Sequence, residues 1–387
     1  MKATKIIYDK NEDAFGIAVY DEKGLAEIDI YNENRALEGN VYLGKIVKKI
    51  KLANDKFGFM VNIGDGVEAF MNAYEPSLKE ANMNEGQSVV VQVLQEKRAE
   101  KGAKVVRNIH LVGNNIVYCP FKFDVEYSRK ISDIEKAEQL VKTVKEKSNA
   151  QEGWILRTAS VDAEISDILQ EMAELREIYE NIRKKARTFS APSLLYAREN
   201  PLFEYIHRYN GSLQEVIVDT PKMAEDVKTI FDGNVILQKD AFEEFGVEDD
   251  IIDALEKTVK LSSGGSLQIE ETKACVAIDV DSGNVHNVGE IDNINLEAAK
   301  EVARQIRLRN LAGKIIIDFA GSSEYRFMKR IIECLEEELA DDACHSRVLG
   351  LSRAGNVEIL RQRRRPSLQD LYTVECPTCN GTGRVEP

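Results

Sequence analysis

Two apolar segments of this chain end in aspartate, and their spacing constrains the fold more than any other feature. The segments lie at residues 275–281 and 314–318. Side chains of a strand alternate between its faces, so Asp279 and Asp281 are expected on the face opposite to Ile278. The residues between the segments have a helical pattern, which predicts a strand–helix–strand unit with parallel strands. Because the carboxyl ends of such strands share one edge of the sheet, Asp279, Asp281 and Asp318 should converge there.

Carboxylate oxygens grouped in this way are the ligands that a hard divalent cation such as magnesium prefers. The sequence therefore predicts a magnesium site at this edge. The pattern by itself does not distinguish a kinase from a phosphatase or a nuclease.

The helix between the two strands is predicted to begin near Asn295 and to end at Gly313, a residue type that commonly follows a last helical turn. Its apolar residues recur at three- and four-residue steps and should pack on the sheet. A second stripe carries Lys300, Arg304 and Arg307. This stripe is either an ordinary solvated face or a contact for phosphate groups.

Charge is distributed unevenly along the chain. The formal net charge of −14 argues against indiscriminate binding of nucleic acid by the whole surface. Residues 300–330 nevertheless contain eight basic and three acidic side chains, and a second basic cluster consists of Arg361, Arg363, Arg364 and Arg365. Basic residues around an acidic metal site suit a polyanionic substrate.

The length of 387 residues predicts two to four domains. The chain has no apolar stretch long enough for a signal peptide or a membrane span, so we expect a cytoplasmic protein with no membrane partner.

The N-terminal third reads as short strands. Residues 1–37 contain hairpin-like runs, and residues 38–112 contain short strands at regular spacing with glycine at the turns, which is typical of a small closed β-barrel. The succession of motifs in this barrel resembles the S1 type of OB-fold, which binds single-stranded RNA. Such folds stack bases on aromatic rings beside basic residues, so Phe70 and Lys101 are candidate RNA contacts. The alternative for Phe70 is a place in the barrel core.

Residues 113–200 are expected to form another unit, with helices at 134–147 and 162–188. Residues 201–256 then alternate helix and strand. The strands of this last segment could pair with the N-terminal hairpins, so that one domain would be split by the two units inserted into it.

Two cysteines near the C-terminus, Cys376 and Cys379, form a C-x-x-C motif followed by glycines. This is the pattern of a thiolate knuckle that wraps zinc, in which glycines let backbone amides approach the sulfurs. A structural zinc site needs four ligands, and the simplest completion is the same pair from a second subunit. A redox-active or incidental cysteine pair is the alternative.

Several motifs in one order resemble the ribonuclease E/G family along nearly the whole chain. They follow the barrel as Gly153-Trp-Ile-Leu-Arg-Thr-Ala159, Ala277-Ile-Asp-Val-Asp-Ser-Gly283, Asn295-Leu-Glu-Ala-Ala299, Arg304-Gln-Ile-Arg-Leu-Arg309, Ile317-Asp-Phe319, Arg361-Gln-Arg363 with Pro366-Ser-Leu368, and Cys376-Pro-Thr-Cys-Asn-Gly-Thr-Gly383. The resemblance implies an α+β multidomain chain: a ribonuclease H-like subdomain at 1–37 and 201–256, an inserted S1-type OB domain at 38–112 and 5′-sensor at 113–200, a deoxyribonuclease I-like catalytic subdomain at 257–370, and a zinc-link knuckle at 371–387.

The resemblance also implies roles for individual residues. Asp279 and Asp318 match the aspartates that hold magnesium, and Arg157 with Thr158 matches the pair that grips a 5′-monophosphate. Asp281 stands where the family usually carries asparagine, so it is either a third ligand or a hydrogen-bonding helper. Met60 replaces an aromatic residue of the barrel, and the loop at 284–291 looks shortened. The chain stops just past the knuckle, so docking of partner enzymes of RNA decay is not expected.

The resulting prediction is a magnesium-dependent endoribonuclease that cleaves single-stranded RNA, favours 5′-monophosphorylated substrates and leaves 5′-phosphate and 3′-hydroxyl ends. The side chains that would neutralise the RNA backbone are Arg304, Arg307, Arg361 and Arg363. Zinc shared between two subunits would make a homodimer, and the sequence leaves open whether two dimers pair into a tetramer. The alternatives are a non-catalytic RNA-binding or assembly factor and a different magnesium phosphoesterase.

Overall fold

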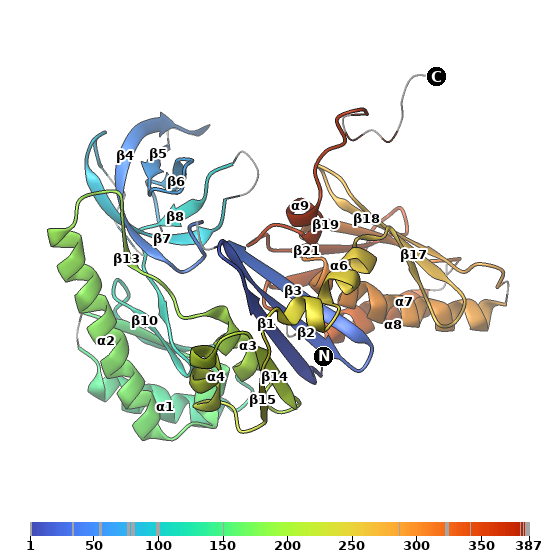
Figure 1. Ribbon diagram of the computed structural model, residues 1–387, viewed down its shortest axis with the longest axis horizontal. Helices are drawn as coiled ribbons and strands as arrows, with labels where there is room; N and C mark the ends of the chain where they lie inside the picture. The colour runs from blue at the N-terminus through green and yellow to red at the C-terminus, as the bar shows by residue number, and fades with distance from the viewer. Residues whose placement is uncertain are drawn as a thin grey trace. The chain divides into compact units, whose positions relative to one another are not determined.

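The chain folds into two compact units, of which the second is inserted into the first (Figure 1). The first consists of residues 1–33 and 200–387, and the second of residues 34–199. The computed structural model describes residues 2–32, 35–53, 56–75, 78, 82–97, 101–149, 151–285, 287–321, 325–340, 342–379, 381 and 383.

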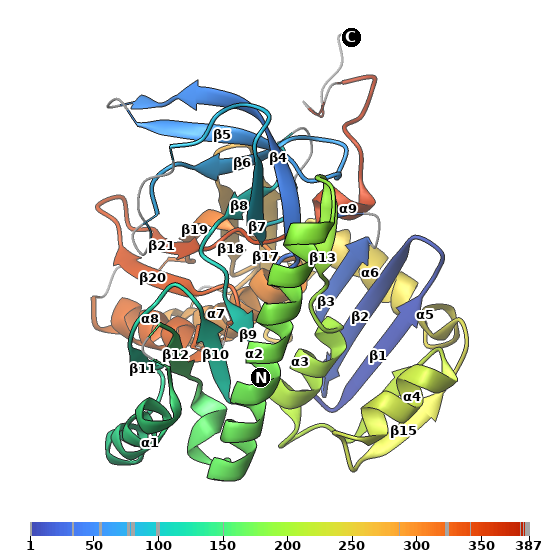
Figure 2. The same cartoon turned by 90° about the vertical axis from the view of Figure 1, so that its left-hand side faces the viewer.

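The first unit begins with a five-stranded sheet in the order β15-β14-β1-β2-β3. Strands β1, β2 and β3 are antiparallel neighbours that lie side by side in Figure 2, whereas β14 and β15 run parallel to β1. The register pairs Ile6 with Val216, which confirms the prediction that a strand after residue 200 pairs with the N-terminal hairpins. The strands are β1 Lys5–Lys10, β2 Ala14–Asp21, β3 Gly24–Asn32, β14 Glu215–Val218 and β15 Asn234–Leu237.

Four helices belong to this part of the first unit: α3 Pro201–Tyr209, α4 Pro221–Lys228, α5 Ala241–Glu244 and α6 Val247–Leu255. Apolar residues of the sheet such as Ile7 and Ile217 form one buried cluster with Ala241 and Ile251 of these helices. The two ends of the insertion meet at one ring cluster: Tyr31 near the end of β3 stacks on Phe15, Phe15 contacts Tyr8, and Asn200 directly before α3 donates a hydrogen bond to the Tyr8 hydroxyl.

A second sheet of the first unit has six strands in the order β16-β17-β18-β19-β21-β20. Strands β18 and β19 are parallel and are joined through α7, as the sequence predicts. Helices α7 and α8 lie along one face, where they share an apolar core with the strands (Figure 1). The elements are β16 Thr258–Lys260, β17 Ser266–Glu271, β18 Val276–Asp281, α7 Val288–Leu308, β19 Gly313–Asp318, α8 Tyr325–Leu339, β20 Ser346–Leu351, β21 Val357–Arg361 and α9 Leu368–Tyr372.

Helix α7 differs from its prediction at both ends. It begins at Val288, seven residues before Asn295, because the Asn287 side chain accepts a hydrogen bond from the Gly289 amide and caps the first turn. It ends at Leu308, and the left-handed residue after it is Asn310, with φ of 50°. Gly313, with φ of 92°, begins β19 instead.

The second unit contains the predicted barrel. Strands β4, β5, β6, β8 and β7 pair in that order, and β7 pairs back with β4, so the barrel of five strands is closed in the manner of an OB-fold. Inward residues such as Phe59 and Val91 fill it. The strands are β4 Val41–Lys51, β5 Phe57–Asn62, β6 Ala69–Asn72, β7 Ser88–Gln95 and β8 Lys104–Val106, with β13 Ser193–Tyr196 added beside β4.

A four-stranded sheet and two helices complete the second unit. The sheet has the order β11-β12-β10-β9, and Trp154 of β12 is fully buried between it and α2, with the Arg176 guanidinium over its ring. The elements are β9 Leu111–Val112, β10 Ile116–Cys119, β11 Val125–Tyr127, α1 Ile134–Lys147, β12 Gly153–Leu156, the 3₁₀ helix η2 Thr158–Val161 and α2 Ile165–Thr188. Both predicted helices are present, and α2 begins three residues later than expected.

Candidate active site

Asp279 and Asp318 are neighbours on two adjacent parallel strands. They are register partners, and each is exposed on the face of the sheet that does not carry α7. The alternation that the sequence predicts is present in β18, where Val276, Ile278 and Val280 are buried and the intervening residues are exposed. Adjacent strands lie about 4.8 Å apart, so the two carboxylates can reach one small ion.

Asp281 lies on the same face, one pleat further along β18. Its partner across the sheet is Ser266 of β17, and its carboxylate accepts a hydrogen bond of 2.8 Å from the Gly283 amide. One oxygen of Asp281 therefore holds the turn that leaves β18, while the side chain as a whole remains exposed.

Asn295 supports this site, and the sequence analysis gave it no such role. Its side chain is fully buried on α7, donates to the Ala320 carbonyl at 2.8 Å and accepts from the Ala320 amide at 3.1 Å. This pair of bonds fixes the chain directly after Asp318. The signal in the sequence is a polar residue on the apolar face of a predicted helix.

The two carboxylates form a small donor set. Within the described residues no group of three or more histidine, cysteine, aspartate or glutamate side chains is arranged to hold an ion. Two carboxylates suit magnesium, which keeps several waters and takes one or two protein carboxylates. The pair Asp279 and Asp318 therefore fits magnesium.

The predicted basic contacts of α7 have partners inside the first unit. Arg304 donates to the Leu25 carbonyl at 2.6 Å and lies 3.6 Å from the Asp21 carboxylate. Arg307 donates to the Glu338 carbonyl at 2.7 Å, at the end of α8. Both side chains are partly buried, so these contacts connect α7 to its neighbours.

Arg361 is buried, and the contact with RNA that the sequence predicts does not fit its position. Its guanidinium binds both oxygens of Asp342, at 2.8 and 2.9 Å, and also the side chain of Asn310. Burial raises the pKa of Asp342, but the bonds from Arg361 outweigh it and bring that pKa down to about 2. Arg363 is half-buried over Gly313 and donates to the Ala312 carbonyl at 3.1 Å.

The barrel carries a row of side chains on its outer surface. Phe70 is half-buried, lies over Gly58 and pairs with Met60 on one side and Lys104 on the other. Met60 in turn pairs with Lys48. This barrel row, Lys48–Met60–Phe70–Lys104, places an aromatic ring and a methionine between two lysines. Lys101 is exposed shortly before β8.

Arg157 and Thr158 lie where β12 meets η2 in the second unit. The Arg157 guanidinium donates to the Gly113 carbonyl, and Thr158 is exposed. Glu171 of α2 accepts hydrogen bonds from the amides of Asn114 and Asn115, which holds residues 113–115 beside Arg157. The role of Glu171 could not be predicted from the sequence, because its contacts come from a loop 56 residues away.

The cysteine pair lies near the end of the described chain. Cys376 is exposed and Cys379 is half-buried. Hydrogen bonds from the backbone amides of Cys379 and Thr378 lower the pKa of the Cys376 thiol. Amides directed at a sulfur are a property of thiolate knuckles, but the zinc ion itself remains a prediction.

Comparison with known proteins identifies the family to which this chain belongs. The model of the ribonuclease E/G family matches residues 110–364, and the chain belongs to this family. It is similar to the protein named ribonuclease G of Haemophilus influenzae, with 29% identity over 420 residues that cover 100% of this chain and 85% of the relative. Ribonuclease G of Escherichia coli strain K12 is 29% identical over 405 residues, covering 96% of this chain and 82% of the relative. Ribonuclease E of the same strain is 29% identical over 403 residues, covering 95% of this chain and 38% of the relative.

None of the helices in the described part of the chain could cross a bilayer.

Proposed function

We propose that this protein cleaves single-stranded RNA with magnesium held by Asp279 and Asp318. Membership of the ribonuclease E/G family makes the chain an endoribonuclease. The observation that carries the finer proposal is the register pairing of the two exposed aspartates at the carboxyl ends of parallel strands. That edge is where ligands gather in open α/β sheets.

The chain supplies position and charge to this reaction. Asp279 and Asp318 would hold the ion, which would polarise a phosphate oxygen and lower the pKa of an attacking water. Asn295 fixes the backbone beyond Asp318, and Asp281 either joins the ligands or orders the turn through Gly283. With water as the nucleophile, the products carry a 5′-phosphate and a 3′-hydroxyl.

The barrel row is the proposed contact for the RNA strand. A base stacked on Phe70 would be flanked by Met60, while Lys48, Lys104 and Lys101 lie within reach of adjacent phosphates. Arg304, Arg307 and Arg363 support this function through the fold, since each already binds a backbone carbonyl.

The 5′ end of the RNA is assigned to Arg157 and Thr158. The guanidinium gives paired hydrogen bonds to phosphate oxygens and the hydroxyl adds another. The arginine is oriented by the Gly113 carbonyl, and the adjacent loop is anchored by Glu171.

The remaining assignments concern architecture. The strand order β15-β14-β1-β2-β3, with three antiparallel strands followed by two parallel ones, supports a ribonuclease H-like subdomain. The six-stranded sheet with α7 and α8 supports the deoxyribonuclease I-like subdomain. We also propose that Cys376 and Cys379 share zinc with a second copy, which makes a homodimer that is able to pair into a tetramer, and that the protein is cytoplasmic.

The test is cleavage of a fluorescent 5′-monophosphorylated oligoribonucleotide. Asp279→Asn and Asp318→Asn should each reduce the magnesium-dependent rate by at least about 100-fold, because each removes a charged ligand of the ion, while RNA binding is largely retained. Glu270→Gln is the matched control, since this carboxylate is exposed one pleat away on β17 and pairs with Lys257 instead.

Retained magnesium-dependent cleavage in both aspartate variants would refute the metal assignment. A parent protein that binds RNA but never cleaves it would instead be a non-catalytic RNA-binding factor.

A further inference from the structure

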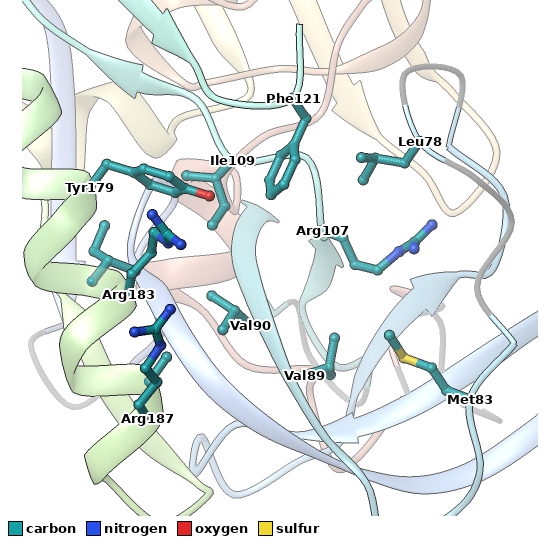
Figure 3. A pocket seen from close by; sticks show the side chains of 12 residues that line it. Leu78, Met83, Val89, Val90, Arg107, Ile109, Phe121, Tyr179, Arg183 and Arg187 are labelled. Atoms are coloured by element: carbon teal, nitrogen blue, oxygen red, sulfur yellow. The ribbon is translucent and has the colours of Figure 1, made fainter. Parts of the chain in front are cut away.

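A cavity of about 390 Å³ lies within the second unit, between the barrel and helix α2 (Figure 3). Its volume falls in the range of small-ligand sites. Val89 and Val90 of β7 form part of its wall, and Tyr179, Arg183 and Arg187 approach it from α2. None of Asp279, Asp318, Arg157 and Thr158 lines it.

On the helix side, three of the side chains that line the cavity are spaced four residues apart. Tyr179, Arg183 and Arg187 occupy successive turns of one helix face, so a ring is followed by two cations. Arg183 pairs with Glu180 at 2.7 Å, but both side chains are about half exposed, with relative areas of 48% and 54%. Such an ion pair contributes little and can be exchanged for a ligand. Arg187 is exposed.

Phe121 and several aliphatic side chains line the cavity beside α2. Phe121 meets Tyr179 edge to face, with ring centroids 6.4 Å apart, and both rings are half-buried at the cavity. Arg107 also lines the cavity, but it is held by the Ala73 carbonyl at 3.0 Å and by Glu75. The described lining residues therefore include two rings and three arginines but no carboxylate.

We propose that this cavity binds one nucleotide of a single-stranded RNA chain, with the base against Tyr179 and Phe121 and the flanking phosphates on Arg183 and Arg187. This inference rests on the proposed function, because it takes RNA as the ligand. Rings beside exposed arginines are how proteins hold single strands without reading sequence. The site differs from the proposed 5′-phosphate site at Arg157 and Thr158, since Tyr179 lies eight residues beyond Glu171, about 12 Å along α2.

The experiment measures binding of a short fluorescent oligoribonucleotide with a 5′-hydroxyl end, so that a 5′-phosphate contributes nothing. All proteins are full-length and carry Asp279→Asn and Asp318→Asn to prevent cleavage. Arg183→Gln with Arg187→Gln is compared with Lys136→Gln and Lys184→Gln, which remove two exposed charges of the same unit outside the cavity.

We expect the arginine pair to lower the slope of log affinity against log salt by about 1.4, because each lost contact with a single-strand phosphate removes about 0.7. The lysine pair should leave the slope unchanged. Tyr179→Leu should weaken binding roughly fivefold or more through lost base stacking, and photocrosslinked 4-thiouridine RNA should label the peptides that contain Phe121 or Tyr179.

Equal slopes and affinities for the arginine and lysine variants would overturn the proposal. So would competition by free adenosine monophosphate at the same concentration as the oligonucleotide, because the occupant would then not be part of an RNA chain. The experiment measures binding alone. If the parent protein never cleaved RNA, the proposed function would be refuted, but the binding result for this cavity could still be interpreted.

Discussion

Arg361 shows how a single residue can look functional in the sequence and be structural in the fold. It lies in a basic cluster, yet its side chain is 4% exposed and is bonded to Asp342 on both oxygens. The cluster was visible because it is local in sequence. The burial of Arg361 could not be predicted in the same way, because its partners Asp342 and Asn310 lie 19 and 51 residues away in the sequence.

The Arg361–Asp342 pair predicts a dependence of stability on pH. The folded pKa of Asp342 is about 2, below its ordinary value of 3.8. The pair therefore stabilises the fold fully above about pH 4, and this contribution of about 2 kcal/mol is lost as the pH falls from about 4 to 2. Urea unfolding across this range should show the loss in the parent protein but not in Asp342→Asn.

The Asp342→Asn substitution should itself lower the free energy of unfolding. At neutral pH Asp342→Asn should be less stable than the parent by about 3 to 5 kcal/mol, because it leaves Arg361 buried without its charge partner. The difference between the two proteins should narrow in acid. A constant difference between pH 5 and 2 would contradict the assignment of this pKa to Asp342.

At the scale of elements, the sequence predicted the strands and helices that bear the candidate site, since alternation in β18 and the helical period of α7 are local patterns. The start of α7 was missed because Val288 and Gly289 are weak helix formers, and the Asn287 cap compensates for them. The predicted end of α7 was wrong because Asn310, rather than Gly313, takes the left-handed conformation after the helix. Hydrogen bonds with Pro366 and Arg361 hold Asn310 there.

The junction of β12 and η2 carries the proposed grip on the RNA 5′ end. Arg157→Gln and Thr158→Val should remove the preference for a 5′-monophosphate over a 5′-hydroxyl while leaving the rate on the hydroxyl substrate nearly unchanged. The reason is that these side chains would bind only the terminal phosphate. Parallel cleavage assays on the two substrates measure the ratio, with Thr143→Val of α1 as a half-buried control in the same unit.

If the parent protein cleaves both substrates at one rate, the 5′-sensor assignment fails, whatever the variants do. If the ratio persists in Arg157→Gln, another residue must bind the phosphate.

At the scale of the whole molecule, the cysteine pair predicts how copies of the chain assemble. In the proposed assembly, two thiolates from each of two subunits would complete a tetrahedral zinc site. Zinc content and mass in solution should therefore fall together when a chelator is added, from about one zinc per two chains in a dimer to a zinc-free monomer. Cys376→Ser should have the same effect, whereas Cys334→Ser on α8 should not.

A monomeric, zinc-free and fully active parent protein would contradict this assembly. A dimer that survives chelation would show that other surfaces suffice to hold it together.

The parallel pairing of β1 with β14 has a consequence for the order in which the protein is made. Residues 5–7 pair with residues 215–217. Strand β1 therefore cannot pair with β14 until the whole inserted unit has been synthesised. At ordinary rates of translation this delay is about 10 to 40 s. The inserted unit has its own cores and can fold within that interval, while the edge of β1 stays open to other strands. We therefore expect nascent chains halted before residue 215 to bind chaperones more than longer chains do.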